Sequence, residues 1–448
     1  MIIISPLGST ENLKEAVDFG LTFYRLPLLC SNICILPAVT YNGIIQKSKM
    51  YEPPAPIMPT PIISTPYITP YITPTPITTT PIISTPPTPI ATPIIESKVV
   101  YYGSPGRTQY PNNSYEHNLA RSIWDMQCHH DRIYIGNGDA WGNQGPVTIW
   151  SIGNNETGFK QEITIMEEMC YTIREYNDKL IIPGTDSYGD SSGNIYTKND
   201  VWKTIPIYAT KISDACSLGN MLYTTLLRGS ASLLMKTDGV TWKTIVEYPN
   251  YDDGLVSLCL PLDDFIIFEA SEKYISYIFR CSKDDKIEKL YIRPNYSSNA
   301  PMYRSARYKN GYLCVFSYPL HVQYAPYPLY FLTTSNITMV DFFKNAIVRD
   351  VVVRGNDVYA LTAEIKDNSF WGYIYYSPNL INWTLLSSFN LTSMPNSFEF
   401  LEGSFYVGTC IKEFNNTVVS EADSGSIYKI RISPPAPIGI LNGDLYGF

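Results

Sequence analysis

The sequence predicts an all-β fold: a seven-bladed β-propeller preceded by a Pro/Thr-rich extended stalk and a small N-terminal segment. Three observations support this prediction. A turn residue followed by an apolar or tyrosine-rich strand recurs seven times. Tyrosine is frequent, with 36 residues in 448, and its side chain suits strands with a half-exposed face. A proline-rich stretch separates the repeats from the N-terminal residues.

The repeat has an almost constant length. Its turn residues are separated by 47, 42, 44, 46, 46 and 47 positions and are Asp131, Asp178, Asn220, Asp264, Asn310, Asn356 and Gly403. Units of about 45 residues are typical of four-stranded propeller blades. In each unit we expect an apolar strand before the turn and three strands after it. Residues 97–435 are therefore assigned to the propeller, and 436–448 form a C-terminal tail.

Two turns between the third and outer strands share a further pattern. Asp238 and Asn379 each precede a tryptophan by four residues, at Trp242 and Trp383. We expect the polar side chain to close the turn while the indole covers the edge of the blade.

The last unit lacks an outer strand of its own. It ends with residues 426–432, Ser-Ile-Tyr-Lys-Ile-Arg-Ile, which are soon followed by Pro434 and Pro435. Residues 98–102, Lys-Val-Val-Tyr-Tyr, form an unassigned apolar strand before the first unit. We predict that this strand completes blade seven and closes the ring, because closure removes an exposed sheet edge.

Several segments resemble a known group of propellers. Residues 122–126, 133–139, 145–150 and 181–186 are similar to the opening blades of an uncharacterised seven-bladed β-propeller group. The turn Asp238-Gly239-Val240-Thr241-Trp242 resembles the Asp-box of sialidase-like and BNR-type propellers. The resemblance implies a propeller with Asp-box-like repeats and supplies no catalytic residues.

The chain before the propeller divides in two. Residues 1–50 are predicted to be an attachment segment that docks to a larger assembly, with an isolated miniature domain as the alternative. Residues 51–96 form a Pro/Thr-rich linker or stalk. Between Pro53 and Pro93 lie 14 of the 34 prolines, and no charged residue occurs between Glu52 and Glu96. Such spacing favours extended polyproline-like chain.

Composition excludes several classes of function. The formal net charge is −8 and charged residues make up 17% of the chain, against about 25% in ordinary domains, so nucleic-acid binding is not expected. The apolar residues 26–39 are too short and too proline-broken for a membrane span, and no Sec signal peptide is evident. The nine cysteines are scattered, so we interpret most of them as small buried hydrophobes.

Five polar or aromatic residues of the first two units are predicted to bind a ligand: Asp125, Asp139, Trp141, Asn143 and Asp186. Residues 137–145 combine glycines, an indole and amide or carboxylate groups, which suit stacking on a sugar. A structural turn is the alternative. Asp125 either lines the central channel or hydrogen-bonds a neighbouring blade. Residues 186–194 offer oxygen ligands for Ca²⁺, but their spacing fits no standard loop, so no cofactor is predicted.

No catalytic residue and no metal site are predicted. His129 and His130 are adjacent on a strand, where successive side chains point to opposite faces, so they are not expected to share an ion. The arginines that a sialidase would need are spread over many units: Arg107, Arg121, Arg174, Arg228, Arg280, Arg293, Arg304, Arg307 and Arg354.

The order of anchor, uncharged spacer and propeller predicts a non-catalytic binding or structural protein. We expect a virion or appendage surface protein, outside the cell, that recognises a host glycan or protein receptor. Two alternatives stay open. One is an extracellular carbohydrate-active enzyme, a glycoside hydrolase or lyase, which two carboxylates with Arg or Tyr in one pocket would favour. The other is an internal protein–protein scaffold, because propellers serve all three roles.

Overall fold

The computed structural model describes residues 38–39, 45–46 and 98–431. Within the last range it leaves out 113, 140–141, 155, 190–192, 250–253, 273–274, 294–301, 317–325, 367–368, 415–416 and 420–422. The predicted stalk, the C-terminal tail and most of the attachment segment lie outside the described residues. Within the attachment segment, β1 (Ala38–Val39) pairs antiparallel with β2 (Ile45–Gln46).

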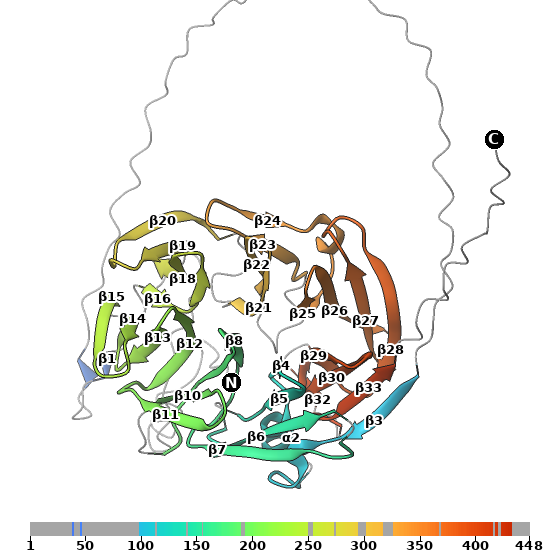
Figure 1. Cartoon of the computed structure of the whole chain (residues 1–448). Helices are drawn as coiled ribbons and strands as arrows, with labels where there is room; N and C mark the ends of the chain where they lie inside the picture. Colours follow the sequence, from blue (N-terminus) through green and yellow to red (C-terminus); the bar gives the residue numbers. More distant parts are fainter. Residues whose placement is uncertain are drawn as a thin grey trace, which may run out of the picture. The chain divides into compact units, whose positions relative to one another are not determined.

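Seven antiparallel sheets form a ring around a central channel, as predicted (Figure 1). Blade one contains β4 (Asp125–His129), β5 (Arg132–Gly136), β6 (Val147–Gly153) and β7 (Lys160–Ile165). Blade two contains β8 (Arg174–Tyr176), β9 (Lys179–Pro183), β10 (Asn194–Lys198) and β11 (Trp202–Pro206). Blade three contains β12 (Lys211–Leu218), β13 (Met221–Arg228), β14 (Ala231–Thr237) and β15 (Trp242–Tyr248).

The remaining blades continue the ring. In blade four, β16 (Gly254–Val256) and β17 (Leu260–Leu262) both pair with β18 (Phe265–Glu272), which is followed by β19 (Ile275–Ser282) and β20 (Ile287–Ile292). Blade five contains β21 (Met302–Tyr308), β22 (Gly311–Phe316), β23 (Leu329–Leu332) and β24 (Ile337–Met339). Blade six contains β25 (Val348–Arg354), β26 (Asp357–Lys366), β27 (Ser369–Ser377) and β28 (Thr384–Leu391).

Blade seven closes the ring as predicted. Its order is β29 (Met394–Leu401), β30 (Ser404–Cys410), β33 (Ile427–Arg431) and then β3 (Val99–Gly103), the strand nearest the start of the propeller. β3 runs antiparallel to β33, with Val99 opposite Ile430. Figure 1 shows β3 in blue beside the red β33. The first and last parts of the propeller sequence therefore share one sheet.

The hydrophobic core lies between blades rather than at one centre. Seven buried clusters each join two neighbouring blades, including the pair formed by blades seven and one. Strand residues therefore bury both faces, one toward each neighbour. Most described cysteines contribute as small buried side chains, as expected: Cys170, Cys216, Cys259, Cys281, Cys314 and Cys410.

The turn that defines the repeat has a common backbone conformation. The residue just before each predicted turn residue has φ between 48° and 63°, at His130, Asn177, Gly219, Asp263, Lys309, Gly355 and Glu402. This left-handed conformation is the one that Gly, Asn and Asp tolerate best, and four of the seven positions hold such a residue: Asn177, Gly219, Asp263 and Gly355. The repeat is therefore the hairpin between the first and second strands of each blade.

The outer turns also form as predicted. Asp238 Oδ1 accepts a hydrogen bond from the Val240 N–H at 3.0 Å, and Asn379 Oδ1 accepts one from the Ile381 N–H at 3.0 Å. Trp242 packs with the cluster between blades two and three. The carboxylate or amide thus closes the turn, and the indole covers the blade edge.

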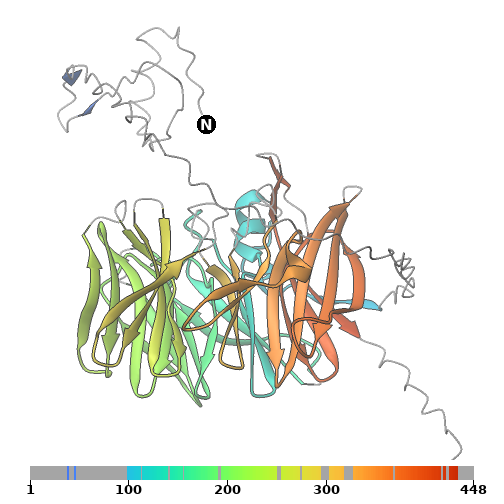
Figure 2. The ribbon, with the colours of Figure 1, turned by 90° about the horizontal axis from the view of Figure 1, so that it is seen from above.

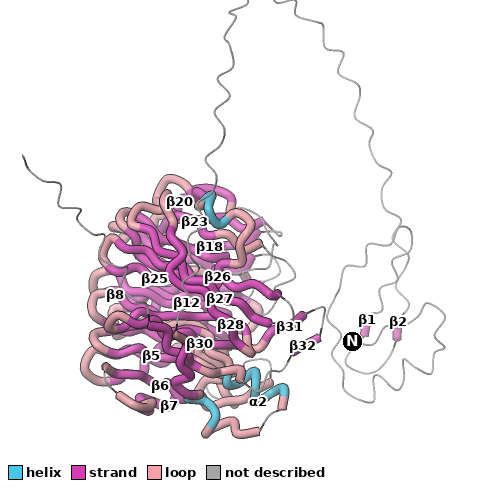
Figure 3. The backbone as a smooth tube through the Cα atoms, turned by 90° about the vertical axis from the view of Figure 1, so that its right-hand side faces the viewer, coloured by secondary structure: helices cyan, strands magenta, loops and turns pink. Residues whose placement is uncertain are grey.

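The two faces of the ring differ. The tight hairpins lie on one face, which we call the hairpin face. The opposite face carries longer loops, including helix α2 (Tyr115–Arg121) and the strand pair β31 (Lys412–Phe414) and β32 (Thr417–Val419) (Figures 2 and 3). Among the described residues, no helix is long and apolar enough to cross a membrane. Short 3₁₀ turns occur at η1 (Pro105–Arg107) and η3 (Asp341–Phe343).

Candidate functional site

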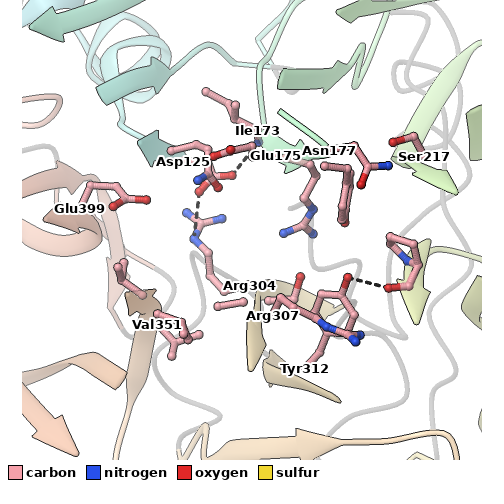
Figure 4. Close-up of a pocket in the computed structure, with 18 of the residues that line it drawn as sticks. Asp125, Ile173, Glu175, Asn177, Ser217, Arg304, Arg307, Tyr312, Val351 and Glu399 are labelled. Atoms are coloured by element: carbon pink, nitrogen blue, oxygen red, sulfur yellow. Dashed lines mark hydrogen bonds and ion pairs between the residues drawn. The ribbon is translucent and has the colours of Figure 1, made fainter. Parts of the chain in front are cut away.

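The central channel holds a cavity of about 670 Å³ that is lined by residues of all seven blades (Figure 4). It contains residues of the inner strands and of the hairpins that follow them, so it lies toward the hairpin face. Five carboxylates line it, from Asp125, Glu175, Asp263, Asp350 and Glu399. Four arginines do so as well, namely Arg174, Arg304, Arg307 and Arg354. The cavity is thus polar and carries both signs of charge.

Three inner-strand aspartates share one bonding pattern: Asp125 in β4, Asp214 in β12 and Asp350 in β25. One oxygen accepts the N–H of the next residue, and the other accepts an N–H of the following blade. The donors are Met126 (3.0 Å) and Ile173 (2.6 Å) for Asp125, Ala215 (2.9 Å) and Cys259 (3.2 Å) for Asp214, and Val351 (2.8 Å) and Phe398 (2.9 Å) for Asp350. These aspartates join neighbouring blades. For Asp125, both predicted alternatives hold, because it also lines the cavity.

Arg304, on β21 of blade five, bridges two of these aspartates. Its Nε atom lies 3.5 Å from Asp125 Oδ1 and 3.4 Å from Asp350 Oδ1 (Figure 4). All three side chains are almost fully buried. Arg174 pairs with Asp214 in the same way, at 3.3 Å. Buried charges are tolerated when each has a partner of opposite charge and hydrogen bonds, as these side chains do.

Charge pairs nearer the opening are more exposed. Arg307 Nη2 lies 3.6 Å from Asp263 Oδ1, and their side chains are 43% and 61% exposed. Arg354 pairs with the buried Glu399.

Burial raises the pKa of Glu399 to about 7, although Arg354 opposes the shift. Burial likewise raises the pKa of Asp350, against the influence of Arg304.

Asp139, Asn143 and Asp186 lie at the opposite end of the blades, in loops between second and third strands. Asp139 and Asp186 both contact Glu168: the Asp139 N–H donates to the Glu168 carbonyl at 2.7 Å, and the Glu168 N–H donates to the Asp186 carbonyl at 2.8 Å. Asn143 is exposed, and Trp141 lies outside the described residues. The structure therefore separates Asp125 from the two loop aspartates, which it brings together.

Glu167, beside this loop cluster, was not predicted. Its carboxylate is fully buried and Oε1 accepts hydrogen bonds from the Asn194 N–H and the Tyr196 hydroxyl, each at 3.2 Å. Burial raises its pKa to about 7, despite these donors. Neighbouring Glu168 has its pKa raised to about 7 by burial and by the charges of Asp186 and Asp139.

Because burial raises the pKa of these carboxyl groups, the free energy of unfolding should fall as pH rises. A carboxyl group whose pKa is higher in the folded than in the unfolded chain favours the folded state. This contribution is complete at pH values below the unfolded-state pKa, and it is lost as pH rises through the folded-state pKa. Melting temperatures of the full chain should therefore decrease from about pH 5 to about pH 8. Glu167→Gln should flatten that decrease, whereas Glu288→Gln, at an exposed carboxylate, should leave it unchanged. Identical pH profiles for all three proteins would contradict the assignment.

The expectation that His129 and His130 point to opposite faces is wrong. His129 ends β4, but His130 is the left-handed residue of the hairpin, with φ of 55°. This conformation breaks the strand alternation and stacks the two rings, with centroids 4.0 Å apart. Both side chains then lie near Asp178 of the blade-two hairpin.

The ion pairs of the central channel were not predicted, although the sequence repeat contains a pattern that indicates them. Asp125, Asp214, Arg304 and Asp350 all stand six positions before the turn residue of their unit. In blades three, five and six a β-bulge directly precedes this position. A bulge re-aims the following side chain. Aligning the units by their turns would have shown charged residues recurring at this position.

Comparison with known proteins supplies no family. No protein-family model matches this chain, and no curated protein matches it. Virginiamycin B lyase from Staphylococcus aureus has a TM-score of 0.49 at 13% identity, over 75% of this chain and all of the other. A PL25 ulvan lyase has a TM-score of 0.44 at 10% identity, over 75% and 96%. The propeller domain of the Trilobed protease from Pyrococcus furiosus has a TM-score of 0.43 at 13% identity, over 64% and 91%. Similarity at this level assigns neither a family nor an activity to this chain.

Proposed function

We propose that this protein is a non-catalytic binding protein whose propeller recognises a surface glycan or protein at the channel mouth on the hairpin face. The observation that carries the proposal is the way the buried carboxylates are held. Both oxygens of Asp125 and both of Asp350 accept backbone N–H bonds. Glu399 accepts the Cys128 N–H through Oε1 at 3.0 Å and the Phe400 N–H through Oε2 at 3.1 Å.

Such bonding opposes acid–base catalysis. A general acid or base must reach within about 3 Å of a substrate atom and exchange a proton with it. Moving Asp125 or Asp350 toward a substrate would break the hydrogen bond to the following blade. Their bonds to Arg304 would also be lost. These carboxylates therefore act as structural groups that hold the channel in one shape.

The channel mouth offers groups suited to a neutral polar ligand. Asp263, Glu175, Arg307 and Arg354 all keep part of their side chain exposed. Carboxylates accept hydrogen bonds and guanidinium groups donate them, while sugar hydroxyls can do both. A rim of mixed charge therefore complements a hydroxyl-rich surface better than a ligand of one charge sign.

The proposal also assigns a location to the protein and a role to the residues before the propeller. We place the protein on a virion or appendage surface, with residues 1–50 docking to a larger assembly and 51–96 acting as the stalk. The support is the order of these segments in the sequence and the lack of charged residues between Glu52 and Glu96. We also propose that the propeller is related to Asp-box propellers. The hydrogen-bonded turns at Asp238 and Asn379 support this relationship.

A binding assay on a glycan array and on whole cells tests the proposal. The full chain should bind, and Arg307→Ala with Asp263→Ala should weaken binding at least roughly tenfold if these side chains contact the ligand. Arg280→Ala, at an exposed pair on β19, is the matched control. Asn143→Ala tests the opposite face. Binding that depends on Asn143 alone would move the site there, and no binding to any surface would contradict the proposal.

One observation favours a second function, a glycoside hydrolase or lyase. The cavity gathers Asp125 and Asp350 around Arg304, with Tyr312 in the same wall. Product analysis of every bound sugar separates the two functions. Turnover that Asp350→Asn abolishes while the protein stays folded would establish the enzyme, and binding without turnover supports the proposal above.

A further inference from the structure

We propose that the hairpins of blades one and two form a binding site for a divalent metal of the Zn²⁺ class, with His129, His130 and Asp178 as its ligands. One donor atom from each of these three side chains lies within 4.8 Å of the other two. The site lies on the hairpin face, beside the channel mouth. Its three ligands differ from the rim residues changed in the glycan-binding test, so the two proposals can fail separately.

The backbone of the two hairpins brings the ligands together. His130 and Asp178 both have left-handed backbone conformations, with φ of 55° and 59°. Their side chains meet between the blades, where His130 Nε2 lies 2.7 Å from Asp178 Oδ1. Tetrahedral Zn–N and Zn–O bonds of about 2.0–2.2 Å place two ligand atoms about 3.3–3.6 Å apart, so a small rotation of either side chain would bring this pair to the spacing that one ion needs.

His129 provides the second, independent observation. Its side chain is 1% exposed, and neither ring nitrogen has a hydrogen-bond partner among the described residues. Burying an imidazole without partners is unfavourable. Its Nδ1 atom lies 3.5 Å from Glu175 Oε1, a further oxygen near the site. A metal bound to one ring nitrogen would give this buried imidazole a partner where no hydrogen bond within the described residues supplies one.

Accessibility and ligand type identify the class of ion. The side chains of His130 and Asp178 are 57% and 73% exposed, so an ion can enter from solvent. Two imidazoles with a carboxylate favour Zn²⁺, Co²⁺, Ni²⁺ or Cu²⁺ over Ca²⁺ and Mg²⁺, which prefer sites made of oxygen alone. The bound ion would join the hairpins of blades one and two, so it should also raise the melting temperature.

Titration of the metal-free full chain with Zn²⁺ and Co²⁺ tests the site. Calorimetry should give one site per chain, and Co²⁺ should show visible absorption bands that report its ligands. His130→Asn and Asp178→Asn should each weaken binding at least roughly tenfold. Asparagine tolerates the left-handed conformation of both positions, so the hairpins should keep their shape. Both variants should also lose the rise in melting temperature that Zn²⁺ produces.

Two matched controls locate the effect. Asp264→Asn changes the equivalent hairpin position of blade four, and His117→Asn removes another histidine, on α2. Neither should alter the affinity or the stoichiometry. Equal binding by the wild-type chain and His130→Asn would overturn the proposal, as would an equal loss in either control. Failure of the wild-type chain to take up either ion would overturn it as well.

Discussion

Deleting residues 1–104 should lower the melting temperature of the propeller by at least roughly 5 °C. The deletion removes β3 and opens the ring at blade seven. It abolishes the pairing of β3 with β33, in which each backbone hydrogen bond contributes about 1 kcal/mol. It also removes Tyr102, whose ring contacts Phe159 of blade one and Tyr406 of blade seven at centroid distances of 5.5 and 5.6 Å.

The matched control is a deletion that ends before the strand. Removing residues 1–96 keeps β3 and should leave the melting temperature nearly unchanged. Without β3 the edge of β33 is open to pairing with other chains, so the longer deletion should also aggregate on heating. Thermal unfolding followed by circular dichroism measures both variants. Equal melting temperatures would show that β3 contributes little to ring closure.

Replacing Arg304 by methionine should destabilise the propeller by about 3–5 kcal/mol near neutral pH. The substitution preserves much of the side-chain volume but leaves the buried carboxylates of Asp125 and Asp350 without the cation between them. Arg304 normally opposes the burial that raises the pKa of Asp350. Without it, that pKa should rise further, so the loss of stability should be larger at about pH 8 than at about pH 5.

Arg307→Met is the control for this prediction. Arg307 lies three residues further along β21 and also pairs with an aspartate, Asp263, but both side chains are largely exposed. Exposed pairs contribute about 0–1 kcal/mol, so the change should be small. Chemical denaturation at the two pH values measures both variants. A destabilisation by Arg304→Met that does not depend on pH would contradict the assigned role of its charge.

The blades could be predicted because their signals are local. The hairpin turn depends on one residue in a left-handed conformation, and the outer turns depend on Asp238 and Asn379 bonding to backbone two residues later. Both lie within a few residues of chain. Strand β3 could be assigned because the last unit lacked a strand and an open edge is unfavourable.

The same local reasoning failed at His130. Strand alternation predicts opposite directions for adjacent side chains, but the left-handed turn conformation at this residue cancels the alternation. Only the folded hairpin shows that His129 and His130 stack, and only the neighbouring blade adds Asp178.

The number of blades, their turns and the strand that closes the ring can be predicted from the residues along the chain, because they follow from periodicity and turn chemistry. Which charges meet in the channel depends instead on the folded ring. Arg304 reaches Asp125 from blade five, and Cys128 donates to Glu399 across 271 residues of sequence. Such contacts depend on the curvature and closure of the whole ring, which place inner strands of distant blades around one axis.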